Sequence, residues 1–510
     1  MAEKVKFQAI KGVRDILPPE SALWNRVEQV AREVFSTFGF AEIRLPIFEE
    51  AEVFARSIGD DTDVVGKEMY KFEDWPAGLD NPRTRIFASE EISRLEDATS
   101  RGELPDSESN RKALTELRKI IGEMDAEQAG NLGSGETPTS WLAGFRKIVS
   151  EYVWQAQFLQ GRMLALRPEA TASVVRAYIE HGMQVQPGNV KLYYMGPMFR
   201  REKPQKGRYR QFYQIGAEVL GTSDAPGIDA EVIEMLMSFF AKLKLQGAVL
   251  HINSIGDKNC RPAYVEKLRG ELQKVRDQLG PDSQRRIETN PLRVLDSKLE
   301  SEQGIIEKLP RIGEHLCADC RAHYDEVKRQ LGLRGVAYQE NWRLVRGLDY
   351  YMRTTFEITA PGLGSQNAVC GGGRYDGLVE LLGGPASTKG IGFAIGTDRL
   401  ILSLQEAGEG GIQSGLDVYL AWFGAAAQTA AIGLARRVRD AGFVVELPAV
   451  EMKFGKSLGL ADRLKARYAV IIGDDELAAG VVTVKRLADG SQKKLAEAEL
   501  FSYLHSERNR

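Results

Sequence analysis

Arginine, carboxylate, tyrosine and glycine residues gather in five short segments that are widely separated along the chain: 166–172, 195–221, 341–358, 367–378 and 389–402. Arginine can grip phosphate oxygens in pairs, and carboxylates with phenols can orient a polar ligand. The sequence has no GxxxxGK(S/T) loop, no GxGxxG after a strand and no HExxH. The histidines lie outside the five segments; they are His181, His251, His315, His323 and His505. This inventory suits binding of ATP and an amino acid, with catalysis by charge stabilisation rather than by a nucleophilic side chain.

The segment 195–221 predicts a strand, a basic glycine-containing turn and a second strand. Arg200 ends the first apolar run, and the period of two places Gln214, Gly216 and Glu218 on one face of the second. The eleven residues from Arg200 hold six Arg or Lys against one Glu. Such a charge run is typical of a phosphate-binding surface and equally of a solvated face, and the run alone does not decide between them.

The segment 341–358 places Arg346 and Asp349 where a strand is expected to turn, beside Tyr350 and Tyr351. Taken alone, a structural ion pair is the preferred explanation for Arg346 and Asp349. Ordinary core and surface positions of a strand are likewise the preferred explanation for the two tyrosines. A binding site remains the alternative for all four residues.

The other three segments supply the remaining candidates. NAVCGGGRYDGL contains three consecutive glycines, which let backbone approach a planar group closely, although a tight turn is the preferred explanation of a lone triplet. KGIGFAIGTDRLIL is expected to be a glycine-rich strand that leads into a helix carrying Arg399. In LRPEATA, Glu169 and Thr171 follow a proline that fixes the turn.

Length and composition limit the class of protein. With 510 residues, 43% of them apolar and 27% charged, the chain is expected to form two to four soluble globular domains. No apolar run reaches the roughly 20 residues of a membrane span, and the start has no stretch of signal-peptide type. The net charge of −3 does not exclude a nucleic-acid partner, because phosphate binding needs only a local basic surface. Four cysteines suit a reducing cytoplasm, which is the expected location.

The first expected elements are a helix that follows two prolines and a strand after it. Pro18 and Pro19 precede an amphipathic run that predicts a helix ending near Gly39. The stretch AEIRLPIFEE then reads as a strand interrupted by Pro46. Proline costs no ladder hydrogen bond at a sheet edge, so an edge position is expected there.

The rest of the chain alternates in character. Residues 163–222 and 340–402 alternate short apolar runs with turns, which predicts antiparallel strands. Residues 75–160 and 223–335 show helical spacing, and the second of these stretches is highly charged. Residues 416–505 alternate strands with helices, which indicates a small α/β domain after a glycine-rich linker.

One group of residues raises the question of a metal. Cys317 and Cys320 form a CxxC pair, His323 follows three residues later, and Cys260 lies elsewhere. A CxxC without a second matched pair is weak support for zinc. No metal site is therefore predicted, and the binding of zinc by these four residues stays open.

Five of these motifs resemble those of one enzyme family. FRREKPQKGRYRQFYQIGAE resembles the second signature motif of class II aminoacyl-tRNA synthetases in its histidyl form, GIGFAIGTDRL the third and FAEIRLPIFEE the first. LVRGLDYY and AVCGGGRYDGL resemble the two histidine-specific motifs of histidyl-tRNA synthetases. About 95 residues at the end are similar to the anticodon-binding domain of several class II enzymes. The likeness covers nearly all of the chain except about 75–160.

The resemblance implies an α+β fold, in which an antiparallel-sheet catalytic core with helical insertions is joined to a C-terminal α/β anticodon-binding domain. It also implies an aminoacyl-tRNA ligase that converts L-histidine and ATP to histidyl-adenylate and pyrophosphate, then transfers histidine to the 3′ end of its tRNA. The implied divisions are 1–74 (first motif), 75–160 (insertion), 161–222 (second motif), 223–338 (mostly helical), 339–407 (histidine motifs and third motif), 408–415 (linker) and 416–510 (anticodon-binding domain).

The resemblance also implies roles for individual residues. Arg200 and Arg346 would approach the α-phosphate of ATP, Arg399 would hold the γ-phosphate, and Mg²⁺ would accompany the nucleotide. Histidine would be bound by Glu169 and Thr171 at its amino group, by Gln214 at its carboxylate, and by Glu218, Tyr350 and Tyr351 at its imidazole, with Tyr375 closing the pocket. A neutral imidazole has one donor and one acceptor, so a carboxylate opposite a phenol reads both nitrogens. The tRNA acceptor end would meet Gln205, Lys206 and Arg208.

The resemblance leaves other functions to weigh. A synthetase-like regulatory subunit of histidine biosynthesis would bind histidine without aminoacylation, and it usually lacks the anticodon domain. A synthetase-derived RNA-binding protein is a third possibility, which the intact arginines and the Glu–Tyr pair disfavour. The first motif also resembles the family's interface motif, so a homodimer is expected. Two departures from the family are the long insertion and Ala170, which stands where a glycine is expected.

Overall fold

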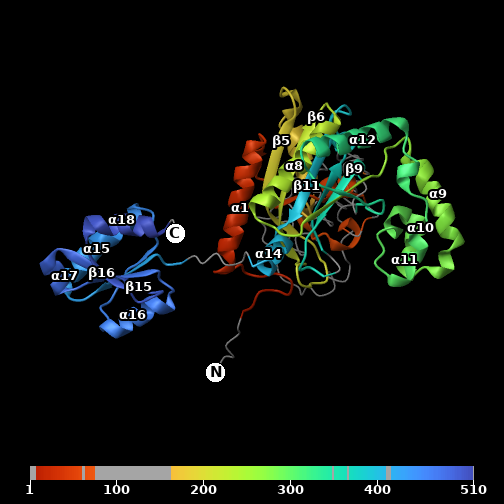
Figure 1. Ribbon diagram of the computed structural model, residues 1–510. Coiled ribbons are helices and arrows are strands. Elements are labelled where there is room, and N and C mark those ends of the chain that lie inside the picture. Colours follow the sequence, from red (N-terminus) through yellow and green to blue (C-terminus); the bar gives the residue numbers. More distant parts are fainter. Residues whose placement is uncertain are drawn as a thin grey trace. The chain divides into compact units, whose positions relative to one another are not determined.

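A computed structural model describes residues 7–59, 62, 64–74, 101, 162–346, 350–364, 367–408 and 415–508. These residues form two compact units, one mainly before residue 411 and the other mainly after it (Figure 1). Among the described residues, no helix is long and apolar enough to cross a membrane. Apart from Arg101, the expected insertion 75–160 lies outside the described residues.

The first unit is built on an eight-stranded sheet. Its strands, in spatial order, are β1 (Ala41–Glu42), β5 (Val190–Phe199), β6 (Gln211–Gly221), β11 (Lys389–Gly396), β10 (Ala368–Arg374), β9 (Met352–Thr359), β7 (Val249–Ser254) and β8 (Gln339–Glu340). The two edge pairs, β1 with β5 and β7 with β8, are parallel, and all other neighbours are antiparallel. The expected antiparallel core is therefore confirmed.

The basic turn predicted around Arg200 joins β5 to β6, as expected. In the middle of the sheet, Gln214 of β6 pairs with Gly196 of β5 and with Gly396 of β11. Four residues on, Glu218 lies opposite Gly392. The period of two therefore places Gln214 and Glu218 on one face, directly beside a strand rich in glycine.

The stretch AEIRLPIFEE forms two short strands in different sheets. β1 is an edge strand of the large sheet, whereas β2 (Phe48–Glu50) belongs to a three-stranded antiparallel sheet with β4 (Arg162–Leu166) and β3 (Lys71–Asp74). The chain changes sheets at Pro46, which has no amide hydrogen to donate. The Arg167 side chain braces this corner, because its Nη1 donates to the carbonyls of Leu45 at 2.9 Å and Pro46 at 3.1 Å.

The first helix of this unit begins where the sequence predicts it. The helix predicted after Pro19 is α1, and it buries Leu23, Val27 and Val34 along one side. The helices are α1 (Glu20–Thr37), α2 (Ala51–Ile58), α7 (Thr171–Glu180), α8 (Pro226–Lys242), α9 (Arg261–Lys274), α10 (Pro281–Thr289), α11 (Glu300–Ile306), α12 (Ala318–Leu333), α13 (Leu378–Leu381) and α14 (Thr397–Glu406).

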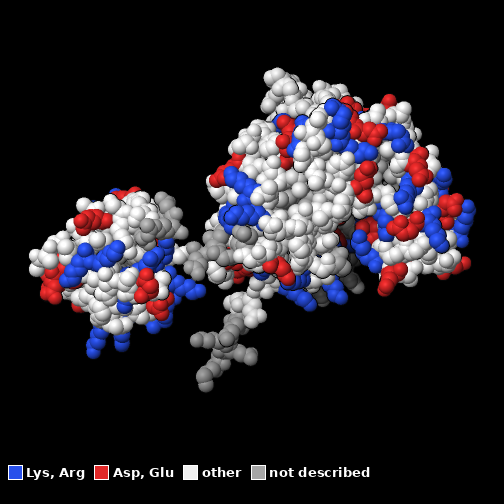
Figure 2. Space-filling view, in the orientation of Figure 1, with Lys and Arg blue, Asp and Glu red and all other residues white. Residues whose placement is uncertain are grey.

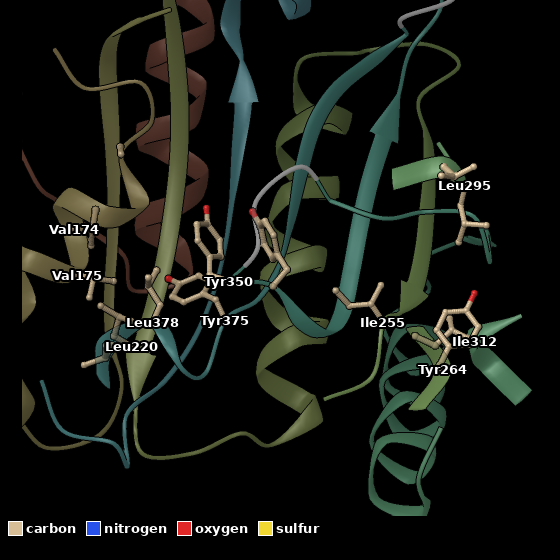
Figure 3. Packing of buried hydrophobic residues seen from close by; sticks show 14 of the residues in the cluster. Val174, Val175, Leu220, Ile255, Tyr264, Leu295, Ile312, Tyr350, Tyr375 and Leu378 are labelled. Carbon is tan, nitrogen blue, oxygen red and sulfur yellow. The ribbon is translucent and has the colours of Figure 1, made fainter. Parts of the chain in front are cut away.

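The stretch 223–335 is mainly helical, but it also contains β7, which the helical spacing did not reveal. β7 pairs with β9 and so becomes part of the large sheet. Helices α9, α10 and α11 lie together at one side of the unit (Figure 1), and acidic and basic side chains are mixed over them (Figure 2). Their buried residues share one apolar cluster with Tyr350 and Tyr375, which connects the helical part to the centre of the sheet (Figure 3).

The second unit is the small α/β domain expected from the alternation of its elements. Its sheet has the order β13 (Val445–Glu446), β12 (Val418–Trp422), β14 (Tyr468–Ile472), β15 (Val481–Arg486) and β16 (Gln492–Ala496). Its helices are α15 (Ala425–Asp440), α16 (Phe454–Arg463), α17 (Asp474–Ala479) and α18 (Glu497–Arg508). β12 and β14 are buried at every position, as parallel strands covered on both faces must be.

Candidate active site

A cavity of about 470 Å³ opens beside the central strands of the large sheet, and it gathers residues from all five segments. The predicted residues that line it are Glu169, Thr171, Arg200, Arg208, Gln214, Arg346, Tyr350, Tyr351 and Arg399. Among the predicted residues, Glu218 and Tyr375 do not line the cavity but are buried in contact with residues that do. A second cavity of about 540 Å³, between α8, β7 and residues 334–339, contains none of the predicted residues.

Three arginines approach the cavity from three different elements. Arg200 follows β5 and donates from Nε to the carbonyl of Pro168 at 2.9 Å, which holds its side chain across the cavity wall. Arg399 is in the first turn of α14, and its Nη1 donates to the carbonyl of Ala368 at 2.9 Å. Burial and the nearby Arg208 lower the pKa of Arg399. The arrangement concentrates positive charge in one place, which stabilises a bound polyphosphate.

Arg346 comes from the segment before β9 and is held by two neighbours. Its Nη1 donates to Glu357 Oε2 at 3.0 Å, and its guanidinium carbon lies 5.8 Å from the centre of the Tyr351 ring. Its Nε is buried and has no hydrogen-bond partner among the described residues. A buried donor without an acceptor is costly, so this atom is suited to an anionic oxygen of a ligand. Asp349, the other half of the expected ion pair, lies outside the described residues.

Four buried side chains form a continuous network under the cavity. Glu169 accepts hydrogen bonds from the backbone amides of Thr171 (2.7 Å) and Ala172 (2.9 Å), and so holds the first turn of α7. The Thr171 hydroxyl donates to Glu218 Oε1 at 2.7 Å, and the Tyr375 hydroxyl donates to Glu218 Oε2 at 2.5 Å. Each oxygen of Glu218 therefore has one protein partner and one remaining lone pair.

The network holds carboxyl groups in an environment that disfavours charge. Burial raises the pKa of Glu218 to about 8, although the hydroxyls of Tyr375 and Thr171 oppose the shift. Burial also raises the pKa of Glu169. The pKa of Tyr351 rises to about 12 because its ring is buried. A group that enters this pocket with a proton to donate, or with a positive charge, is stabilised by both carboxylates.

Strands β10 and β11, which lie beside the cavity, are rich in glycine. A Cβ added to Gly371 would collide with the Arg346 guanidinium, and one added to Gly373 would come within 2.9 Å of the Tyr351 ring. A Cβ on Gly392 would meet Glu218. Gly371–Gly373 lie inside strand β10, so the expectation of a tight turn at this triplet was wrong. The glycines are there because side chains from other elements lie directly on the backbone.

Aromatic rings lie next to these glycines. The ring centres of Tyr350 and Tyr351 are 4.6 Å apart, and those of Tyr350 and Tyr375 are 5.8 Å apart. Figure 3 shows Tyr350 next to Tyr375. Tyr194 of β5 was not predicted; burial, and then the nearby Glu218, raise its pKa. It lies opposite Gly216, where an added Cβ would collide with its hydroxyl. The small residue opposite it, Gly216, is the one feature of the sequence that could have pointed to Tyr194.

Four further carboxylates line the cavity and were not predicted: Glu202, Asp296, Glu357 and Asp398. Glu357 pairs with Arg346, as described above, and Glu202 pairs with Arg208 at 3.4 Å (Nη1 to Oε2). The Oε2 atom of Glu202 is buried and accepts no hydrogen bond from the described residues. Both glutamates belong to the side of the cavity where the arginines gather.

The basic turn after β5 has a defined shape. The backbone amides and carbonyls of Gln205 and Arg208 bond to each other at 3.1 and 2.9 Å, with Lys206 and Gly207 at the tip. Gly207 has a φ of +74°, which favours glycine. Arg208 lines the cavity, whereas Gln205 and Lys206 are exposed outside it. The turn therefore connects the cavity to the surface.

Comparisons with known proteins agree with this geometry. The family model described as "Histidyl-tRNA synthetase" matches residues 139–400, and the one described as "Anticodon binding domain" matches residues 417–507. Two curated histidine–tRNA ligases are similar over nearly their full lengths. The one from Solibacter usitatus is 45% identical, covering 99% of this chain and 100% of the relative, and that from Koribacter versatilis is 44% identical, covering 98% and 96%. The crystal structure of apo histidyl-tRNA synthetase from S. aureus superposes with a TM-score of 0.67 at 31% identity, covering 98% of this chain and 100% of that one.

Proposed function

The chain belongs to the histidyl-tRNA synthetase family, and from this premise we propose how its residues divide the reaction between them. The enzyme is a histidine–tRNA ligase. Histidine and ATP give histidyl-adenylate and pyrophosphate, and the histidyl group then passes to the 3′ end of the tRNA. The regulatory-subunit alternative is not favoured, because full-length relatives at 40–45% identity are ligases. The observation that carries the assignment of roles is the gathering of three arginines and the Glu218 network at one cavity.

We assign the arginine side of the cavity to ATP. Arg200 and Arg346 approach the α-phosphate, and Arg399 holds the γ-phosphate. As the histidine carboxylate attacks the α-phosphorus, negative charge builds on the oxygens around it. Guanidinium groups already in place stabilise that charge without having to reorganise. Support comes from Arg346, whose buried Nε has no hydrogen-bond partner among the described residues.

Magnesium would enter with ATP and neutralise part of the charge of its phosphates. The residues present fit such an ion, because Mg²⁺ prefers carboxylate oxygens and two carboxylates face the arginine side. Glu202 and Glu357 would hold it. Support comes from Glu202, whose buried Oε2 lacks a hydrogen bond from the described residues. Both glutamates line the cavity and are paired with arginine there.

We assign the glycine-rich side of the cavity to histidine. Glu169 and Thr171 bind the α-amino group, and Gln214, which lines the cavity, positions the carboxylate by donating from its side-chain NH2. The imidazole lies between Glu218 and Tyr351, so that one nitrogen meets a carboxylate and the other a phenol. Tyr350 packs beside them, and Tyr375 orients Glu218 through the 2.5 Å hydrogen bond.

The exposed turn after β5 would receive the acceptor end of the tRNA. Lys206 and Gln205 lie outside the cavity, and Arg208 lies at its rim, so they can follow a strand that enters from the surface. Lysine and arginine suit a sugar–phosphate backbone. The unit formed mainly by residues 411–510 would bind the anticodon, as the description of its family states. We further propose that the enzyme works in the cytoplasm, which its four free cysteines support.

A screen of pyrophosphate exchange tests the function as a whole. With each of the twenty amino acids supplied in turn, the protein should exchange labelled pyrophosphate into ATP with histidine alone, and EDTA in place of Mg²⁺ should stop the exchange. Histidine tRNA should then accept labelled histidine. Exchange with another amino acid in preference to histidine, or no exchange at all in protein that binds histidine, would overturn the proposal.

We propose that two chains associate through the three-stranded sheet and the neighbouring edge strand β1. Ile47, Phe48, Phe72 and Met163 are exposed there, and the rings of Phe48 and Phe72 lie 6.1 Å apart. An apolar patch of this kind is typical of a protein interface. Light scattering should give the mass of two chains. Phe48→Lys should shift the mass toward one chain, whereas the matched change Leu381→Lys, at an exposed leucine elsewhere, should not. A wild-type mass of one chain would contradict the proposal.

A further inference from the structure

Three cysteines and an aspartate from two distant segments meet at one point in the first unit. Asp257, Cys260, Cys317 and Cys320 each direct one ligand atom into the group, and these atoms all lie within 4.8 Å of one another. All three cysteines are free, and Asp257, Cys260 and Cys320 are buried. Burying the Asp257 carboxylate beside two thiols is costly unless something compensates its charge.

The spacing of the four residues forms two matched pairs. Cys317 and Cys320 are separated by two residues, and so are Asp257 and Cys260. Each pair begins a helix: Cys260 is the N-cap of α9, and Cys317 is the N-cap of α12. One pair of ligands therefore lies at the start of α9 and the other at the start of α12, with their ligand atoms close together. A CxxC pair alone is weak support for a metal site because a second pair of ligands is missing. Asp257 and Cys260 form that second pair.

The backbone around the first pair is shaped to place these ligands. The Asp257 amide lies 3.5 Å from Cys260 Sγ, and Asp257 Oδ1 accepts from the amides of Asn259 at 2.9 Å and Cys260 at 3.3 Å. Gly256 has a φ of +66°, and a Cβ there would come within 2.7 Å of Cys260 Sγ. Amide groups directed at sulfur and a second set of bonds that orients a carboxylate are features of a metal site.

His323 does not belong to this group, although its sequence position suggested it. Its Nε2 lies 3.1 Å from the carbonyl of Asp224 and 3.7 Å from Asp229 Oδ2. Asp257 takes the fourth place instead.

We propose that Asp257, Cys260, Cys317 and Cys320 bind one zinc ion as a structural site. In tetrahedral zinc sites the Zn–S distance is about 2.3 Å, which puts sulfur ligands about 3.8 Å apart. The four atoms need only contract slightly to reach that geometry. Three soft thiolates favour zinc over magnesium or calcium, and zinc also accepts a carboxylate oxygen as its fourth ligand. Four protein ligands leave no open position, so the ion holds the fold and takes no part in the chemistry.

The site would brace the segment that carries the histidine-binding tyrosines. Arg261, next to Cys260, donates from Nη1 to the carbonyl of Tyr351 at 2.6 Å. The amide of Arg353 donates to the carbonyl of Gly256 at 2.7 Å, and Arg353 Nη2 lies 3.8 Å from Asp257 Oδ2. Zinc therefore ties α9 and α12 to the start of β9. This inference is independent of the roles proposed for the arginines.

Metal content of the full-length protein tests the site directly. Protein purified without chelators or a histidine tag should contain one zinc per chain by elemental analysis, with neither iron nor copper in comparable amount. Cys317→Ser and Cys320→Ser should each lose most of it. The matched controls His323→Gln and Cys370→Ser, a histidine three residues away and a buried cysteine elsewhere, should keep it. Zinc retained equally in all four variants, or absent from the wild type, would overturn the proposal.

Cobalt substitution covers the case in which the serine variants fail to fold. Wild-type protein stripped of metal and given Co²⁺ should show thiolate-to-cobalt charge transfer and the strong visible bands of a tetrahedral site, both lost when Zn²⁺ is added. Asp257→Cys should keep the metal and intensify the charge-transfer band, because a fourth thiolate joins three. If stripped protein shows no such bands, or if its cysteines are joined in a disulfide that excludes metal, the zinc site does not exist.

Discussion

Replacing Arg346 by alanine is expected to slow histidine-dependent pyrophosphate exchange by about a hundred- to a thousandfold while leaving the protein folded. The guanidinium is placed before the reaction by Glu357 and by the Tyr351 ring, so its charge is available when the α-phosphorus gains electron density. Removing it leaves Glu357 partly exposed rather than stranded in an apolar core, so little stability is lost. The exchange rate at saturating substrates and a thermal melt measure the two effects.

Two comparisons make this test specific. Arg334→Ala, which removes an arginine paired with Glu234 at the second cavity, should leave the exchange rate unchanged. Gly371→Ala should reproduce much of the loss without altering any charged group, because its methyl would displace the Arg346 guanidinium. Gly377→Ala is the control for the glycine change, since an added Cβ there has no atom within 4 Å. Normal exchange in the Arg346 variant would remove the proposed role.

Glu218→Gln is expected to raise the KM for histidine about 10- to 150-fold and to change the KM for ATP about twofold at most. A hydrogen bond to a charged group contributes about 1.5–3 kcal/mol; Glu218 becomes charged by passing its proton to the imidazole, whereas the amide stays neutral. The amide oxygen can still accept from one of the two hydroxyls of Thr171 and Tyr375, and the amide NH2 can donate to the other if that hydroxyl turns to accept, so the contacts of the network remain. Steady-state exchange with each substrate varied in turn measures both constants. Glu180→Gln, at an exposed ion pair, is the control, and equal increases in both KM values would argue against imidazole recognition.

The same variant has a second readout in its stability without ligands. Burial raises the pKa of Glu218 from 4.5 to about 8, so between these values the folded protein holds a proton that the unfolded chain releases. The free energy of unfolding therefore falls as pH rises through this window. Glutamine cannot titrate and lacks this loss. The Tm of the wild type should consequently decrease relative to that of Glu218→Gln between pH 5 and 8, and parallel curves would show that Glu218 titrates normally.

Local patterns predicted the elements that hold the site. The alternation around Gln214 and Glu218 predicted their common face, and the apolar run before Arg200 predicted the end of β5. The helix expected after the glycine-rich strand is α14, and Arg399 lies in its first turn. Each of these follows from spacing over a few residues, which is the range over which helix and strand periods act. The α/β character of the C-terminal unit was predicted for the same reason.

Contacts between distant segments were beyond such patterns. Thr171 was expected to serve the amino group of the substrate, yet it also donates to Glu218, 47 positions away. Tyr375 was expected to close the pocket, and it donates to the other oxygen of Glu218 from 157 positions away. Spacing does not encode which strands become neighbours, so it could not reveal Tyr194, the place of Asp257 beside the three cysteines, or the reason for three glycines in β10. β7 was missed because its six residues lie among helices.

The glycines of β10 and β11 limit how the amino-acid specificity of the enzyme could be changed. Gly371, Gly373 and Gly392 have no side chain to exchange, and the side chains of Arg346, Tyr351 and Glu218 lie directly on them. Every larger residue at these positions strikes Arg346, Tyr351 or Glu218. For a ligase that accepts a bulkier histidine analogue, no side chain can be shortened at these glycines. The space would have to come from smaller residues in place of the neighbouring tyrosines.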